Sequence, residues 1–340
     1  RKDKNRTYLM KTILERIKIS IFTSFSFLFI VWPFSPIPAC LFLRNIFRFG
    51  TASKPENYAE IHARTKSVVD LCYDSSNYKQ RLDIVLPAEV HEKLPVIFWM
   101  HGGAYIGGDK SDVTEYAVQI ANHGYAVINI NYPLAPEVRY PAGVMSIPQV
   151  YSFIAEHAEE YSLDLSRIYF AGDSAGAQMS AQFVTAQLDG DYAARTKIPQ
   201  IISPENIRGT ALFCGFYDAP AYLDNLKPYA FSTFLIKNIF WGVTGFKNWR
   251  DNSTITEASV LNYIPPSFPP TFITDGNIGS FTDQAIAYSE ALENIGTRVT
   301  TALYPREDAL LRHEYQFNMK LPHSVQTFEK LISFLDSVKK

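Results

Sequence analysis

The stretch IYFAGDSAGAQMS, residues 168–180, places a serine at the junction of two expected elements. Its first four residues are apolar and predict a buried strand, and about thirteen residues from Ala175 onward predict a helix. Ser174 lies between them, within the pattern Gly-x-Ser-x-Gly. In such a turn small residues let the chain pass close to its neighbours while the serine hydroxyl projects above the sheet. The stretch therefore predicts a parallel sheet that carries a nucleophilic serine at the end of a strand.

Apolar runs alternate with helical patterns on both sides of this turn. Short apolar runs bounded by glycine or proline are typical of strands buried on both faces of a parallel sheet. They occur at residues 94–105, 125–131, 167–172, 209–217, 269–276 and 298–305. Residues 67–88 have the mixed alternation of an antiparallel hairpin, and residues 220–265 indicate a helical cap inserted over the sheet. This order predicts an α/β fold with a mostly parallel central sheet flanked by helices.

Length and composition are compatible with one large domain. The chain has 340 residues, of which 47% are hydrophobic, so a sizeable core can form. Its net charge of -2 argues against a nucleic-acid-binding protein. We divide it into a basic and apolar segment, residues 1–50, and a main domain, residues 51–340. Nothing in the sequence indicates an oligomeric state.

The N-terminal segment contains 25 uncharged residues, 19–43, behind a basic flank. A helix of this length would cross a bilayer, but Pro33, Pro36 and Pro38 predict that the first helix ends near Trp32. We expect a membrane anchor or an uncleaved signal, and hence a location at a membrane or in the cell envelope. The alternative is a helix packed against the main domain.

Three cysteines, Cys40, Cys72 and Cys214, have no spacing that indicates a disulfide framework or a metal site. Cys72 and Cys214 fall in apolar runs, where we expect them to be small buried side chains.

A second glycine-rich stretch, MHGGAYIGGD at residues 100–109, follows another expected strand. Backbone N–H groups at adjacent glycines can point to one spot, as is needed to stabilise an oxyanion. We predict that Gly102 and Gly103 supply two donors and that Ala175 supplies a third. His101 is expected to orient this loop through a backbone hydrogen bond.

These motifs resemble a known family. HGGA at residues 101–104, NYPLAPEVRYPA at 131–142 and GDSAGA at 172–177 are similar to the hormone-sensitive-lipase-like family of α/β-hydrolases, which includes bacterial carboxylesterases and acetyl esterases. The resemblance covers roughly residues 66–340. It implies the α/β-hydrolase fold, a Ser–acid–His triad in that chain order and a cap formed partly from N-terminal residues. It also implies hydrolysis of small acyl esters without a metal or cofactor.

The general base has to be a histidine that follows Ser174, and His313 and His323 are the two candidates. His313 lies in LLRHEYQF, after the last expected strand, where the family carries its histidine. We therefore predict His313 as the base and His323 as a surface residue.

The acid is harder to assign. In the family an Asp-Pro-Leu sequence follows the seventh strand, and the corresponding helix here places Gly279 at the position of the aspartate. Asp275, at the expected end of a strand, is the first candidate, and Asp283 is the alternative. Glu307 and Asp308, just upstream of the histidine, are further candidates. An acid that only orients an imidazole can come from several positions.

Together these residues predict a serine hydrolase that cleaves short-chain carboxylic esters through an acyl-Ser174 intermediate. The expected partner is a small acyl ester, and neither a metal nor a cofactor is expected. The same fold also carries out amide hydrolysis, so an amidase or peptidase is an alternative. A non-enzymatic binding protein of the cell envelope is a second alternative.

Overall fold

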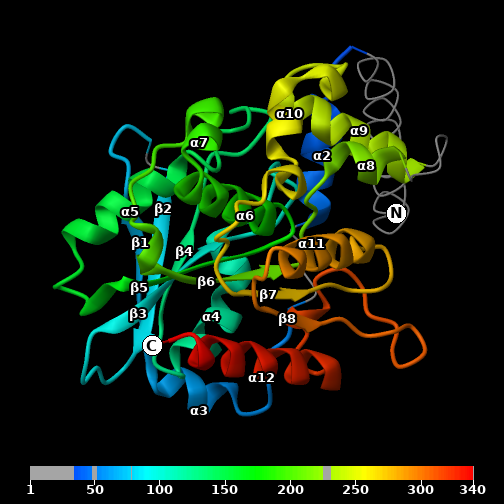
Figure 1. Cartoon of the computed structure of the whole chain (residues 1–340). Helices are drawn as coiled ribbons and strands as arrows, with labels where there is room; N and C mark the ends of the chain where they lie inside the picture. Colours follow the sequence, from blue (N-terminus) through cyan, green and yellow to red (C-terminus); the bar gives the residue numbers. More distant parts are fainter. Residues whose placement is uncertain (1–33, 48–51, 78, 225–230, 340) are drawn as a thin grey trace, which may run out of the picture.

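The computed structural model describes residues 34–47, 52–77, 79–224 and 231–339. They form an eight-stranded sheet in the order β1-β2-β4-β3-β5-β6-β7-β8 (Figure 1). The strands are β1 (Thr65–Cys72), β2 (Arg81–Pro87), β3 (Leu94–Met100), β4 (Ala126–Ile130), β5 (Leu163–Asp173), β6 (Ile207–Phe213), β7 (Thr271–Thr274) and β8 (Val299–Ala302).

The sheet is mostly parallel, as predicted. β1 pairs with β2, and β2 with β4, in antiparallel register, while every other pairing is parallel. Every residue of β3 and of β4 is buried. Such burial on both faces explains why these strands appear in the sequence as continuous apolar runs rather than as alternating ones.

Helices cover both faces of the sheet (Figure 1). One hydrophobic core lies between the sheet and α5, α6 and α11, and a second lies between the opposite face and α4 and α12. The helices are α2 (Ile37–Phe47), α3 (Tyr58–Ala63), α4 (Thr114–Ala121), α5 (Ser146–Glu156), α6 (Ala175–Leu188), α7 (Gly190–Thr196), α8 (Ala219–Asp224), α9 (Phe231–Thr244), α10 (Ser253–Ala258), α11 (Thr282–Asn294) and α12 (Pro322–Ser337). Short 3-10 turns are η1 (Lys110–Val113), η2 (Pro204–Asn206), η3 (Trp249–Asp251), η4 (Val260–Tyr263) and η5 (Tyr315–Phe317).

One buried position was predicted wrongly. Cys72 is exposed, because β1 is the edge strand of the sheet and most of its side chains are accessible. Cys214 is buried just beyond the end of β6, a central strand. The difference follows from sheet order, which an apolar run does not encode.

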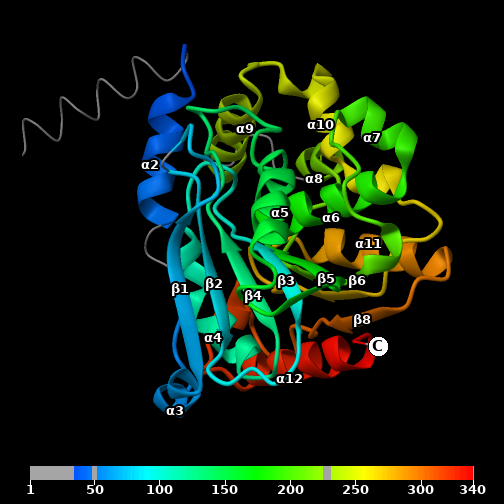
Figure 2. The ribbon, with the colours of Figure 1, turned by 90° about the vertical axis from the view of Figure 1, so that its left-hand side faces the viewer.

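The segment where the sequence predicts a cap is helical, and α2 packs against it (Figure 2). Cys40 on α2 lies with its Sγ 3.7 Å from the carbonyl oxygen of Asn238 on α9. Gly242, one turn later on α9, faces the same sulfur so closely that a Cβ there would come within 3.0 Å of it. Most of the predicted membrane segment, up to residue 33, lies outside the described residues. Among the described helices, none is long and apolar enough to cross a bilayer.

The turn that holds Ser174 depends on two glycines. A Cβ at Gly176 would come within 3.0 Å of the carbonyl oxygens of Met100 and His101. A Cβ at Gly172 would clash with the backbone of Gly176. The first turn of α6 therefore lies directly against the end of β3, and no residue with a side chain fits at either position.

We expect the substitution Gly176→Ala to lower the free energy of unfolding by about 3 kcal/mol or more, because its methyl group would overlap backbone atoms that cannot move aside. Urea denaturation followed by circular dichroism measures this change. Gly190→Ala is the matched control, since the nearest atom to its added Cβ is 3.8 Å away. Equal stability of the two variants would contradict the packing described here.

Candidate active site

Ser174 occupies the sharp turn between β5 and α6. Its backbone has φ 52° and ψ -115°, a conformation that L-residues rarely adopt. The turn is held in place because the Ser174 N–H donates to the carbonyl oxygen of Phe213 on β6, at 2.8 Å. The side chain is nearly buried at the carboxyl ends of the parallel strands, the edge where ligands bind in sheets of this type.

His313 meets Ser174 from the loop after β8. Its Nε2 lies 3.1 Å from Ser174 Oγ, although the two residues are 139 positions apart. The imidazole packs nearly perpendicular to the ring of Phe281, with 5.1 Å between the ring centroids. Burial lowers the pKa of His313 to about 4, so the imidazole is neutral at pH 7 and able to accept a proton.

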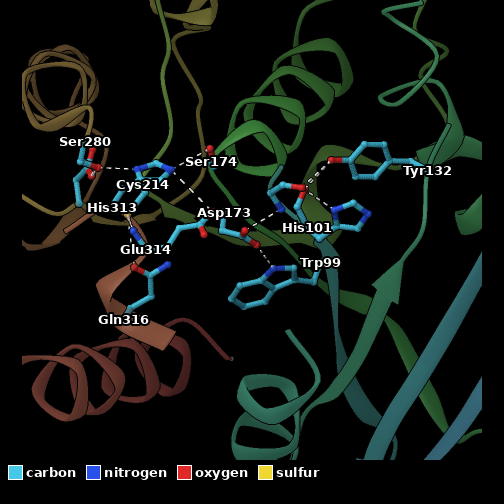
Figure 3. A network of polar contacts seen from close by, with 12 residues as sticks. Trp99, His101, Tyr132, Asp173, Ser174, Cys214, Ser280, His313, Glu314 and Gln316 are labelled. Atoms are coloured by element: carbon cyan, nitrogen blue, oxygen red, sulfur yellow. Dashed lines mark hydrogen bonds and ion pairs between the residues drawn. The ribbon is translucent and has the colours of Figure 1, made fainter. Parts of the chain in front are cut away.

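The other imidazole nitrogen contacts a hydroxyl group rather than a carboxylate. His313 Nδ1 lies 2.7 Å from Ser280 Oγ, and the Ser280 hydroxyl donates to Oδ1 of Asp275. Figure 3 shows Ser280, His313 and Ser174 in a row. Asp275 directly follows β7 and is 1% exposed. Burial raises the pKa of Asp275 to about 7. Of the candidate acids, Asp275 therefore reaches His313 through Ser280.

Asp283, Glu307 and Asp308 have exposed side chains and form no hydrogen bond or ion pair with His313. Gly279, where the family pattern has its aspartate, has φ +59°, and a Cβ there would meet no atom within 4 Å. The chain thus has no carboxylate at that position.

Ser280 was not predicted from the sequence. The missing aspartate at Gly279 was the available signal, because it left His313 without its expected partner and a hydroxyl group stood at the next residue.

His323 lies apart from this group. It sits in the first turn of α12, and its ring centroid is 4.8 Å from that of Tyr304.

The predicted oxyanion donors differ in their availability. The N–H of Gly102 donates to Asp173 Oδ2 at 2.7 Å, so this group is already occupied, contrary to the prediction. Within the described part of the chain, the N–H groups of Gly103 and Ala175 have no acceptor. Ala175 opens α6, whose N-terminus carries partial positive charge.

Asp173 connects the glycine-rich loop to the serine turn. Its carboxylate also accepts a hydrogen bond from Trp99 Nε1 on β3, at 2.8 Å. Burial, together with the charge of Asp173, raises the pKa of Glu314 well above its usual range. Glu314 therefore carries the proton of the pair at neutral pH, and Asp173 remains an acceptor for the loop.

His101 and Tyr132 support the loop from the other side. His101 Nδ1 lies 2.7 Å from the carbonyl oxygen of Gly102, in agreement with the orienting role predicted for this histidine. Tyr132 stacks on the imidazole, with ring centroids 4.3 Å apart, and its hydroxyl donates to the carbonyl oxygen of His101 at 2.8 Å. The NYPLAPE stretch thus buttresses the glycine-rich loop.

Among the residues that the structure describes, one group of side chains has donor atoms that are close enough together for a metal ion. Cys214, Asp275 and His313 offer ligand atoms that all lie within 4.8 Å of one another. Because Asp275 and His313 both contact the Ser280 hydroxyl, we assign these two residues to the hydrogen-bond chain that ends at Ser174.

Comparison with known proteins identifies the family. Residues 82–294 match the BD-FAE family, and the chain belongs to it. A "Carboxylesterase NlhH" from Mycobacterium tuberculosis is 31% identical over 224 residues, which cover 64% of this chain and 67% of the relative. The predicted membership of an α/β-hydrolase carboxylesterase family is therefore confirmed.

A curated "Esterase" from Gibberella moniliformis is 26% identical over 216 residues, or 62% of this chain. The chain spans 64% of that relative, just under two thirds of its length. Among solved structures, Esterase B from Lactobacillus rhamnosus HN001 superposes with a TM-score of 0.71 at 18% identity, covering 97% of this chain and 96% of the other. This likeness confirms the predicted α/β-hydrolase fold.

Proposed function

We propose that the chain is a serine hydrolase that cleaves carboxylic esters through an acyl-Ser174 intermediate. The observation that carries this proposal is the 3.1 Å contact between Ser174 Oγ and Nε2 of a neutral His313. A serine hydroxyl becomes a useful nucleophile when a base within hydrogen-bond reach takes its proton. The names of the relatives, esterase and carboxylesterase, support the same reaction.

In the first half of the reaction, Ser174 Oγ attacks the ester carbonyl carbon while His313 Nε2 takes the hydroxyl proton. The carbonyl oxygen becomes an oxyanion, to which the N–H groups of Gly103 and Ala175 donate. Collapse of this intermediate breaks the bond to the alkoxy oxygen. His313 returns the proton to that oxygen, the alcohol leaves, and the acyl group remains on Ser174.

In the second half, a water molecule attacks the acyl carbon while His313 Nε2 takes its proton. The second oxyanion uses the same donors, the bond to Ser174 Oγ breaks, and His313 returns the proton to that oxygen. The carboxylic acid leaves, and the enzyme is restored without any oxidant, reductant or cofactor.

Ser280 and Asp275 are positioning residues in this scheme. An ionised Asp275 accepts the hydroxyl proton of Ser280, so Ser280 Oγ accepts in turn from His313 Nδ1–H. This sequence of hydrogen bonds leaves Nε2 unprotonated and facing Ser174, the tautomer that the reaction requires.

For the substrate we propose esters of short acyl chains. The support is an "Acetyl esterase" from Salmonella schwarzengrund, 38% identical over 86 residues, or 25% of this chain. The ring of Phe240 in the cap packs between Phe216, which follows β6, and Trp249, with ring centroids 5.9 and 4.8 Å apart.

Replacing either reacting side chain tests the central proposal. We expect Ser174→Ala and His313→Ala to lower kcat for p-nitrophenyl acetate by at least about 10³-fold, because each removes the nucleophile or its base. Circular dichroism checks the fold. His323→Ala is the matched control and should retain wild-type turnover, since this ring contacts Tyr304 rather than Ser174. Substantial turnover by Ser174→Ala would contradict the proposal.

Ser280→Ala tests the hydroxyl bridge. We expect kcat to fall about 10- to 100-fold with KM nearly unchanged, because the imidazole loses its orienting partner while the substrate surface is untouched. Ser280→Thr keeps the hydroxyl group and should restore most of the rate. Ser289→Ala, which removes another buried hydroxyl from the neighbouring helix α11, is the control. A wild-type kcat in Ser280→Ala would contradict the positioning role proposed for Ser280.

The pH dependence separates Asp275 from His313. Below about pH 7 Asp275 is protonated and no longer draws the Ser280 proton, so the productive tautomer is lost. We therefore expect kcat/KM to rise with pH around a midpoint near 7. In Asp275→Asn this transition should disappear, and kcat/KM should be lower at neutral pH. The remaining fall in kcat/KM at acid pH should then follow protonation of His313, whose pKa lies well below 6.5. A midpoint near 7 that persists in Asp275→Asn would contradict this assignment.

A further inference from the structure

Apart from Asn45, whose amide donates to the carbonyl oxygen of Leu41, the exposed side chains on the outward face of α2 are apolar. Its apolar side chains, Ile37, Leu41, Phe42 and Ile46, are between 41% and 49% exposed, and we call them the α2 outer face. A surface helix normally carries polar or charged residues on this side. α2 contains no acidic residue, and its one charged residue, Arg44, is turned inward.

The contacts of the opposite face fix the orientation of the helix. Ala39, Cys40 and Leu43 are buried, and Cys40 meets the cap helix α9. Arg44 donates to the carbonyl oxygen of Ala135 at 2.7 Å and forms an ion pair with Glu137. Since these contacts hold one side of α2 against the protein, the α2 outer face cannot turn inward.

Exposed large apolar side chains are concentrated in this one segment. Fourteen such side chains occur in the described part of the chain, and six of them lie between residues 34 and 47. The six are Phe34, Ile37, Leu41, Phe42, Ile46 and Phe47. Isolated exposed apolar residues are common on protein surfaces. A contiguous group of them marks a surface that a membrane or another molecule covers.

The charge of the preceding sequence identifies the kind of partner. Residues 1–18 contain seven Lys or Arg and two Asp or Glu, and residues 19–33 contain no charge. They lead directly to the N-terminal end of α2. Apolar side chains beside an excess of cationic ones are the combination that binds the interface of an anionic bilayer.

We propose that the α2 outer face docks on the surface of an anionic lipid bilayer. Residues 19–33 carry no charge, and an anionic bilayer interface accommodates such a sequence together with the α2 outer face.

Docking would hold the bilayer near the glycine-rich loop. Arg44 donates from Nε to the carbonyl oxygen of Ile106, three residues after Gly103. One helix therefore contacts this loop on its inner side and offers the apolar face on its outer side. The inference goes beyond the proposed reaction and does not rest on it.

Flotation with lipid vesicles tests the proposal on the full chain carrying Ser174→Ala, so that lipid hydrolysis cannot affect the result. Vesicles contain either phosphatidylcholine alone or phosphatidylcholine with about one third phosphatidylglycerol. We expect binding to the anionic vesicles that weakens with added salt. The double variant Leu41→Glu/Phe42→Glu should lower the partition coefficient at least about tenfold, because two apolar side chains no longer enter the interface.

The control is Val69→Glu/Val325→Glu, which changes two exposed apolar residues on β1 and α12 and should bind as the parent does. If the α2 double variant fails to fold, the milder Phe42→Gln replaces it in the same assay. Unchanged binding by a folded α2 variant would overturn the proposal, as would an equal loss in the control. A fall in thermal stability or in oligomer size without a change in binding would overturn it too, by showing that the chain itself or a second copy covers the face.

Discussion

The contact between the first turn of α6 and the carbonyl group of Met100 is the constraint on which the rest of the site depends. It requires glycine at position 176 and, beneath it, at position 172. The close approach brings the serine turn and the glycine-rich loop after β3 to the same edge of the sheet. Ser174 and the N–H groups of Gly103 and Ala175 are neighbours for this reason, and Asp173 links the two loops by hydrogen bonds.

A partly buried chain of hydrogen bonds, from Asp275 through Ser280 to His313, then leaves Nε2 of His313 facing Ser174. In the family pattern a carboxylate would contact the imidazole directly, whereas here Ser280 stands between His313 and Asp275. A hydroxyl group both donates and accepts, so it can pass the orienting effect of a carboxylate to the ring. The arrangement makes the tautomer of His313 depend on the ionisation of Asp275, which burial shifts toward neutral pH.

Much of the fold could be predicted because each strand of a buried parallel sheet appears in the sequence as an apolar run. The turn could be predicted because only glycine fits at positions 172 and 176, where a Cβ would overlap backbone atoms. Ser174 and His313 stand in strong local patterns, and the structure brings them together. The exposure of Cys72 could not be predicted, because the position of β1 at the sheet edge depends on strand order.

The roles of Ser280 and of the Gly102 N–H could not be predicted either. They depend on contacts between residues tens of positions apart, which local patterns do not encode. Likewise, the sequence indicated an apolar N-terminal segment, but only the packing of α2 shows which of its side chains remain exposed.

The most direct test of the account is to trap the nucleophile covalently. A p-nitrophenyl phosphonate ester would be incubated with the full chain, and peptide mass mapping would locate the adduct. The account predicts one phosphonyl group per chain, attached to Ser174, with labelling slowed strongly in His313→Ala because the base that activates the hydroxyl is absent. An adduct on another residue, or none on Ser174 in the folded protein, would contradict it.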